Sequence, residues 1–170
     1  MEFLKLAEDR FSVREFSEQK VPRDVIDRIL KAGLLAPTAC NFQPQRIYVI
    51  ESDEALTKLK KCTGSHFNAP LALLVAFDRN ECWKREYDGK PSGDIDASIV
   101  CTHMMLEAAE LGVGSTWVMH YIPEAVQTEF ELPEEIETTA LLVMGYPKDG
   151  VRPNPLHFKS KPVENTVRFL

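Results

Sequence analysis

The sequence predicts a single globular domain, residues 1–170, that mixes α-helices with β-strands. Three observations support this prediction. The chain has 170 residues, of which 44% are hydrophobic, so it is long enough and apolar enough to bury a core. Several longer segments repeat their apolar residues at the helical spacing of three to four positions. Shorter segments between them are rich in β-branched, aliphatic and aromatic residues, as strands are.

The predicted helices begin and end at recognisable signals. Ser52 or Asp53 can cap one helix, and Pro22 suits the first turn of another. That second helix should end before Pro37, because a residue that precedes proline disfavours helical geometry. We expect helices over residues 1–9, from Pro22 to before Pro37, and over residues 54–62, 94–111 and 124–130.

Three segments are predicted to be strands. Residues 46–51 are rich in β-branched and aromatic side chains, whereas residues 71–77 and 139–146 are almost wholly apolar. A strand that is covered on both faces has such a continuous apolar sequence. We therefore expect the second and third strands to be buried on both sides.

The helix predicted over residues 94–111 is apolar around most of its circumference. Asp94 is a candidate cap at its start, and Gly112 is a typical residue to end it. A helix with apolar residues on most sides is buried on most sides. In so small a domain, burial on every side would require a partner subunit. His103 in this helix is interpreted as a packed histidine.

The charge of the chain narrows the classes of partner. The formal net charge is −6 and no tract is basic, which argues against nucleic acid and anionic membrane. The first nine residues are too charged for a signal peptide, and no apolar run is long enough to span a bilayer. We therefore expect a cytoplasmic protein that binds neither nucleic acid nor membrane.

The cysteines and histidines are scattered along the chain. No Cys-x-x-Cys pair and no zinc-ligand spacing occurs, so we expect free thiols and no metal site. Cys40 is a conceivable nucleophile, but no base accompanies it locally. The four cysteines are Cys40, Cys62, Cys82 and Cys101, and the four histidines are His66, His103, His120 and His157.

Two segments between predicted elements could lie near a site. Residues 78–93 are polar and rich in turn signals, and we expect a mobile loop near a site or a dimer edge. Residues 112–123 begin with two glycines that would let the backbone approach a ligand closely. This second segment is not a dinucleotide-binding fingerprint, because it follows a helix and lacks the third glycine.

Residues 10–16 carry an alternating pattern. In an extended chain, Arg10, Ser12 and Arg14 point to one face, while Phe11 and Val13 point to the other. Two guanidinium groups around a hydroxyl suit a phosphate, because arginine binds oxyanions through paired hydrogen bonds. Taken alone, the same pattern also fits a solvated arginine pair beside a strand edge.

The loop of residues 37–45 offers a second set of polar groups. Thr38 contributes a hydroxyl, and Asn41 and Gln43 contribute carboxamides, which suit hydroxyl-rich or heterocyclic ligands. An ordinary proline turn with capping side chains is the alternative interpretation. Near the end of the chain, Lys159 and Lys161 flank a serine and add two cations.

The order of these motifs resembles the nitroreductase family of flavoproteins, in its short form. The resemblance covers essentially the whole chain, and it rests on the order and separation of the motifs. They are Arg10-x-Ser12-x-Arg14-x-Phe16, Ala36-Pro37-Thr38-x-x-Asn41-x-Gln43-Pro44, Leu111-Gly112-x-Gly114-Ser115-x-Trp117, Leu141-Leu142-Val143-Met144-Gly145-Tyr146-Pro147 and Lys159-Ser160-Lys161.

The resemblance implies an α+β fold, with a central and mostly antiparallel sheet flanked by helices. It implies an interlocked homodimer that holds FMN at the subunit interface, with a C-terminal tail that crosses onto the partner. It also implies a ping-pong oxidoreductase, in which NAD(P)H delivers hydride to flavin N5 and a small-molecule acceptor then takes its place. Nitroaromatics, quinones and free flavins are the acceptors typical of the family. A carrier or redox sensor that binds FMN without turnover is the alternative, and a thiol enzyme using Cys40 is a third.

The resemblance also implies roles for particular residues. Arg10 and Ser12 match ligands of the phosphate and ribityl chain, and Arg14 matches a cation near the flavin N1–O2 edge. Such a cation would stabilise the negative charge that reduction places there. The other matched positions are Pro37 and Thr38 against the ring, Asn41 and Gln43 at the ribityl chain or ring, Trp117 beside the ring, the amides of Met119 or His120 at N5 and O4, and Lys159 and Lys161 at the phosphate.

Several positions depart from the family pattern. Phe11 stands where many members carry a second arginine, and Gln45 replaces a common aromatic residue. Lys161 replaces a common arginine and loses its bidentate fork. Larger members have an acidic residue and a glycine at the positions of Met119 and His120. A proton could come from solvent, from His120 or from Tyr121, and the sequence leaves these alternatives open.

Overall fold

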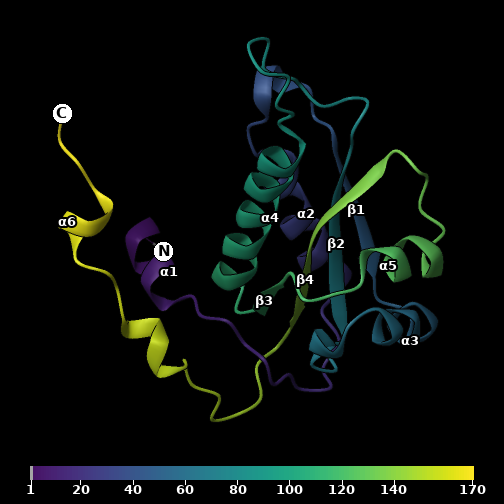
Figure 1. Ribbon diagram of the computed structural model, residues 1–170. Coiled ribbons are helices and arrows are strands. Elements are labelled where there is room, and N and C mark those ends of the chain that lie inside the picture. Colours follow the sequence, from purple (N-terminus) through teal and green to yellow (C-terminus); the bar gives the residue numbers. More distant parts are fainter. Residues whose placement is uncertain (1) are drawn as a thin grey trace.

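The computed structural model describes residues 2–170 (Figure 1). The predicted helix over residues 1–9 is found as α1, and its first residue lies outside the described range. The elements are α1 (Phe3–Asp9), α2 (Arg23–Leu34), η1 (Ala39–Asn41), β1 (Gln45–Ile50), α3 (Asp53–Cys62), η2 (Gly64–His66), β2 (Leu71–Asp78), α4 (Gly93–Glu110), β3 (Gly114–Val118), α5 (Pro123–Glu129), β4 (Ile136–Gly145), η3 (Pro155–Phe158) and α6 (Val163–Thr166).

The centre of the fold is a four-stranded sheet in the order β1-β2-β4-β3. All three strand pairs are antiparallel, which confirms the predicted α+β fold with an antiparallel sheet. The three expected strands are present. The strand β3 was missed, because its sequence begins with glycine and lacks a clear alternation. It is a strand because β4 offers it a hydrogen-bonding edge, on which Trp117 faces Leu142.

Helices cover both faces of this sheet, so its strands contribute to two cores. Leu73 and Leu142 face a core that also contains residues of α2 and α4. Leu74 and Leu141 face the opposite core, beside residues of α3 and α5. All of β2 except Asp78 is buried, which confirms the expectation of a strand covered on both sides. Each such aliphatic side chain contributes roughly 1.5–3 kcal/mol on burial.

The start of α4 differs from the prediction. Asp94 is not the N-cap, since the cap position belongs to Ser92, and the Oδ1 of Asp94 instead accepts a hydrogen bond from Thr139 Oγ1 at 2.8 Å. The end of the helix is as expected, because Gly112 holds a φ of 74°. The outer side of α4 stays open within one chain: Ile95 is 53% exposed, and Ile99 is only partly buried.

Residues 10–17 run as an extended segment along the edge of β3 and the end of β4. The N–H of Val13 donates to the carbonyl of Ser115 at 3.0 Å, and the N–H of Ser17 donates to the carbonyl of Tyr146 at 2.8 Å. Val13 is 2% exposed, and Phe11 packs against the same core. The side chains of Phe11 and Val13 are thus packed as predicted, although Arg10 lines the same groove as these two residues.

The C-terminal tail leaves the body of the protein and passes beside α1 (Figure 1). His157 fixes this course, because its Nε2 lies 2.9 Å from the carbonyl oxygen of Glu8 and its ring meets Phe11 edge-on. Beyond this contact the tail exposes large apolar side chains, among them Phe158 and Phe169. The expected crossing of the tail onto a partner stays a prediction.

The turn between α3 and β2 should be sensitive to acid through His66. The N–H of Asn68 donates to His66 Nδ1 at 2.9 Å, so this nitrogen must be unprotonated. Burial, and secondly the charge of Lys60, lowers the pKa of His66 from its ordinary value of 6.5. A lowered pKa contributes stability that is complete above the unfolded value and is lost as the pH falls through the folded value.

We expect wild type to lose about 1 kcal/mol more stability than a His66→Asn variant between pH 7 and pH 5, the net value of one hydrogen bond. Asparagine can accept the same N–H in an Asx turn and does not titrate. Urea unfolding of both proteins at the two pH values measures the difference. Equal losses in the two proteins would contradict the prediction.

Candidate active site

Arg10, Ser12 and Arg14 lie at the end of the molecule where α4 finishes. Arg10 is half-buried and lines a groove together with Leu6 of α1, Ala109 of the last turn of α4, and the glycines that follow. Ser12 is paired with Ser115 of β3 in a parallel bridge. Arg14 is exposed, and its Nη1 donates to the carbonyl of Ser12 at 3.3 Å.

Neither arginine is held in an ion pair within residues 2–170, although Asp9, which is paired with Lys5, lines the same groove as Arg10. Two uncompensated cations beside a hydroxyl, on a backbone fixed by β3, form a favourable site for an anion. Phe11 is partly buried, packing against the core and meeting the ring of His157.

The second candidate cluster is the loop around η1, and its backbone is strained. Cys40, Asn41 and Gln43 hold positive φ values of 49°, 57° and 52°. A non-glycine residue in this region costs of order 1–3 kcal/mol, and asparagine tolerates it best. The loop closes on itself, because the N–H of Gln43 donates to Thr38 Oγ1 at 3.0 Å. The side chains of Asn41 and Gln43 are left exposed to solvent.

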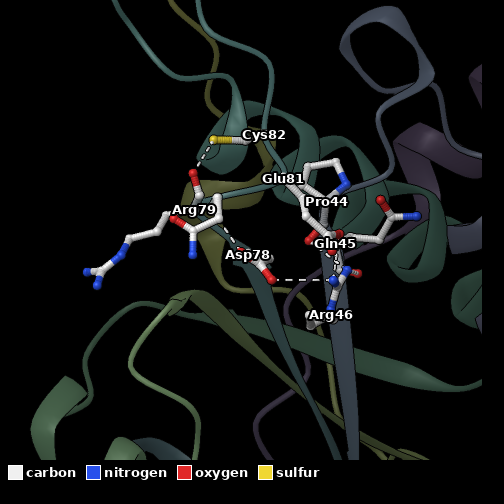
Figure 2. Close-up of polar contacts among 8 residues, drawn as sticks. Pro44, Gln45, Arg46, Asp78, Arg79, Glu81 and Cys82 are labelled. Carbon is white, nitrogen blue, oxygen red and sulfur yellow. Dashed lines mark hydrogen bonds and ion pairs between the residues drawn. The ribbon is translucent and has the colours of Figure 1, made fainter.

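An arginine at the base of this loop was missed by the sequence analysis (Figure 2). Arg46 Nη1 donates to the carbonyls of Pro44 and Gln45 at 3.2 and 3.1 Å. Its Nη2 lies 2.6 Å from Glu81 Oε2 and 3.5 Å from Asp78 Oδ2. The hydrogen bond to Glu81 raises the pKa of Arg46. Arg46 thus joins the base of the loop to the segment that follows β2.

That segment, residues 79–92, folds back on itself as a hairpin. Lys84 pairs with Pro91, and Arg85 forms an ion pair with Asp88 across the turn. Tyr87 near the tip is 94% exposed. The hairpin lies beside the η1 loop at the end of the molecule where α4 begins, which agrees with the expected place near the candidate site (Figure 1). Its expected mobility stays a prediction.

Residues 117–121 leave the edge strand β3. Trp117 packs partly against the core between the sheet and α4, whereas Met119 is 63% exposed and His120 is exposed. The carbonyl of His120 accepts a hydrogen bond from Thr63 Oγ1, which fixes the backbone there. The hydroxyl of Tyr121 donates to the carbonyl of Thr138 at 3.0 Å, and burial raises the pKa of Tyr121. Of the two candidate proton donors, His120 is exposed, whereas Tyr121 is partly buried and bonded to Thr138.

Lys159 and Lys161 are exposed on the tail, just after the histidine that contacts α1. They therefore follow the segment that lies beside Arg10 and Phe11. Neither lysine forms an ion pair with a carboxylate of the described residues 2–170. The structure places the two lysines as free cations on the α1 side of the molecule.

Two groups of the predicted site residues, the cationic cluster of Arg10, Ser12 and Arg14 and the carboxamide loop of residues 37–43, lie far apart in one chain. Arg10 adjoins Ala109 in the last turn of α4, whereas Ala39 of the η1 loop is hydrogen-bonded to Asp96 in the first turn. Thirteen residues of helix separate these contacts, which is about 20 Å at 1.5 Å per residue. One chain therefore does not bring the cationic cluster and the carboxamide loop together.

The described residues hold four cysteines, none of them in a disulfide. Burial raises the pKa of Cys101 to about 12. Cys40 is exposed at a strained position, with no hydrogen bond to a base in residues 2–170. In that same range, no three His, Cys, Asp or Glu side chains gather as a metal site would require. No helix there combines the length and the hydropathy needed to cross a bilayer.

Comparison with known proteins identifies the family. The chain matches the Nitroreductase family over residues 7–69 and 60–146. It is a member of the nitroreductase family. A nitroreductase family protein from Clostridium difficile 630 has a crystal structure that superposes with a TM-score of 0.93 at 39% identity, over 99% of this chain and 98% of the other. This similarity confirms that the chain has the nitroreductase fold.

Two further members carry more specific names. A protein of Archaeoglobus fulgidus named "Putative NADH dehydrogenase/NAD(P)H nitroreductase" is 34% identical over 155 residues, 87% of each chain. The structure of an "FMN-dependent Nitroreductase" from Clostridium difficile R20291 superposes with a TM-score of 0.80 at 26% identity, over 98% of both chains. The family predicted from the order of motifs is thereby confirmed.

Proposed function

We propose that this nitroreductase is an FMN-dependent NAD(P)H oxidoreductase, with residues 1–170 forming one flavin-binding domain. The observation that carries the proposal is the pair of uncompensated arginines around Ser12, held on the edge of β3 where an anionic phosphate can reach them. Family membership supports it, as do the relatives named for FMN and for NAD(P)H.

The separation of the two clusters supports a homodimer. The cluster of Arg10, Ser12 and Arg14 from one chain would meet the loop of residues 37–43 from its partner, with FMN between them. The open side of α4, marked by the exposed Ile95 and the partly buried Ile99, offers an apolar surface for such a partner. This arrangement also accounts for an apolar helix that one chain leaves partly uncovered.

When bound, FMN would supply the hydride chemistry at N5, and the chain would supply binding, orientation and charge. Arg10 and Ser12, with Lys159 and Lys161, would hold the phosphate and ribityl chain. Pro37 and Thr38 would cover the ring, and Asn41 and Gln43 would donate to its polar edge or to the ribityl chain. The amide of Met119 or His120 would donate near N5 and O4, beside Trp117. Each charge-assisted hydrogen bond is worth about 1.5–3 kcal/mol.

The kinetic scheme that follows is ping-pong. NAD(P)H would give up a hydride and leave as NAD(P)+, and an acceptor such as a nitroaromatic, a quinone or a flavin would then take its place and be reduced. The exposed hairpin of residues 79–92 lies beside the η1 loop and is positioned to influence which acceptor fits. His120, which is exposed, could relay a proton from solvent.

The proposal is tested by the colour and the reduction of the purified protein. It should be yellow, or bind added FMN, and the bound flavin should bleach on anaerobic mixing with NADH or NADPH. A protein without affinity for FMN would overturn the proposal. Flavin that binds but stays oxidised with both donors would instead indicate a carrier or sensor.

Arg14→Ala is expected to change reduction more than binding. Removing a cation from the N1–O2 edge should make the flavin midpoint potential more negative by roughly 30–60 mV, which corresponds to one charge-assisted hydrogen bond. Arg14→Lys keeps the charge and should recover most of the shift. Potentiometric titration of the bound flavin measures it, and equal potentials for wild type and Arg14→Ala would contradict the assigned role.

A further inference from the structure

We infer that Asp96 is a positioning residue, which fixes the η1 loop to α4 in the conformation that receives the flavin. The inference rests on the function proposed above for that loop. Asp96 is 2% exposed, and both of its carboxylate oxygens are used. Oδ1 accepts from the N–H of Ala39 at 2.9 Å, and Oδ2 accepts from Ser92 Oγ at 2.6 Å.

A buried carboxylate is costly, so the presence of Asp96 on the buried side of α4 needs a reason. Burying an ionised group is unfavourable unless hydrogen bonds and nearby charge compensate. Here the compensation is local, because the first turn of a helix favours an anion and two donors satisfy the two oxygens. If the position only had to be filled, an apolar side chain would pack there at lower cost. What only the carboxylate provides is a charged acceptor for a loop 57 residues away in sequence.

The accepted N–H stands where the loop departs from ordinary geometry. Ala39 directly precedes Cys40 and Asn41, which both hold positive φ values. Within the loop, Thr38 closes the far end by accepting from the N–H of Gln43. At the start of the loop, Asp96 is the contact from outside it, through the hydrogen bond to the Ala39 N–H. Strained backbone persists only when its surroundings fix it, so removal of this contact should let the loop relax.

The contact also ties the loop to the proposed dimer interface. Ile95, the neighbour of Asp96, is 53% exposed on the open side of α4. One helical turn therefore presents an apolar residue to the partner and holds the loop that would enter the partner's flavin site. A site residue mounted on a rigid helix is placed more accurately than one on a free loop. Asp96 would thus set where Thr38, Asn41 and Gln43 lie in the dimer.

Three variants test the inference. Asp96→Ala leaves the Ala39 N–H unpaired, and we expect FMN to bind about 10-fold more weakly or worse. In Asp96→Asn, the amide oxygen can still accept from Ala39 and the amide NH2 can donate to Ser92 Oγ, so the FMN affinity should fall only about threefold. Asp94→Ala is the matched control, since it removes a carboxylate from the same turn that bonds to Thr139 and not to the loop. Its FMN affinity and its visible flavin circular dichroism should match wild type.

Hydrogen exchange of the Ala39 amide supplies a readout that does not depend on flavin. In the ligand-free protein this amide should exchange faster in Asp96→Ala than in wild type or Asp94→Ala. Unchanged exchange and unchanged FMN affinity in both Asp96 variants would overturn the inference. An equal loss of affinity in Asp94→Ala would also overturn it, because the effect would then be a general weakening of the helix start.

The outcomes separate the inference from the proposed function. If Asp96→Ala does not fold, the test rests on Asp96→Asn. An Asp96→Asn protein that binds FMN as tightly as wild type, with an unshifted Ala39 amide resonance, would overturn the inference. If wild type itself has no affinity for FMN, the proposed function fails, whereas the Ala39 exchange still tests the hold on the loop.

Discussion

An Arg10→Ala variant should lose FMN under conditions in which the wild-type protein retains it. Arg10 is half-buried, has no carboxylate partner within residues 2–170, and lies beside Ser12 on a backbone fixed by β3. The loss of one charge-assisted hydrogen bond, or of a bidentate pair, should raise the dissociation constant for FMN about 10- to 100-fold. Fluorescence titration of the apoprotein with FMN measures this change.

The matched control for Arg10→Ala is Arg79→Ala. Arg79 is exposed and stands at the base of the 79–92 hairpin, but its side chain points away from Arg46 and the η1 loop (Figure 2) and pairs with Glu134 at 3.2 Å, beside α5. Its removal should leave the FMN affinity unchanged. An Arg10→Ala protein that folds, dimerises and binds FMN like wild type would show that the phosphate lies elsewhere. A similar loss in the control would point to a nonspecific effect of net charge.

Two variants that each fail to bind FMN should recover binding when their chains are mixed. One variant carries Arg10→Ala, and the other carries Asn41→Ala with Gln43→Ala. If each site takes its arginine from one chain and its loop from the other, a mixed dimer contains one intact site and one doubly altered site. Random exchange of chains then restores about one quarter of the wild-type sites.

We expect binding to recover because the two clusters lie near opposite ends of α4, too far apart to form one site within a single chain. A site contained within one chain would stay defective in every dimer, because each chain retains its own substitution. Coexpression of the two chains with different affinity tags isolates the mixed dimers, and flavin content per dimer gives the result. Mixed dimers without flavin would contradict the shared site. Controls are the two homodimers and a mixture of either variant with wild type.

The sequence predicted local structure well where one pattern dominated. The apolar runs of β2 and β4, the cap at Ser52 and the glycine after α4 all correspond to observed features. Each depends on interactions within a few residues, or on burial of a continuous segment. β3 was missed because its strand character comes from pairing with β4, a partner more than 20 residues later.

The polar residues of α4 show the same limit more sharply. Asp94 and Asp96 both stand in its first turn, and the sequence offered no reason to prefer either. Asp94 was interpreted as the cap, although it bonds to Thr139, and Asp96 was overlooked. Asp96 needs donors from elsewhere because it is buried, and this burial is set by the packing of α4 in the tertiary structure. Arg46 likewise carried no signal, because its partners become neighbours only through the β1-β2 pairing.

The sequence by itself determined the family, the helices α1 to α5, the buried strands β2 and β4, and the packing of Phe11 and Val13. These properties depend on residue order and periodicity, both of which can be read directly from the linear sequence. Only the tertiary structure decided that the cationic cluster and the carboxamide loop lie at opposite ends of α4, and that Asp96 holds that loop. Distances between remote segments are set by helix length, strand pairing and packing together, and no local pattern records them.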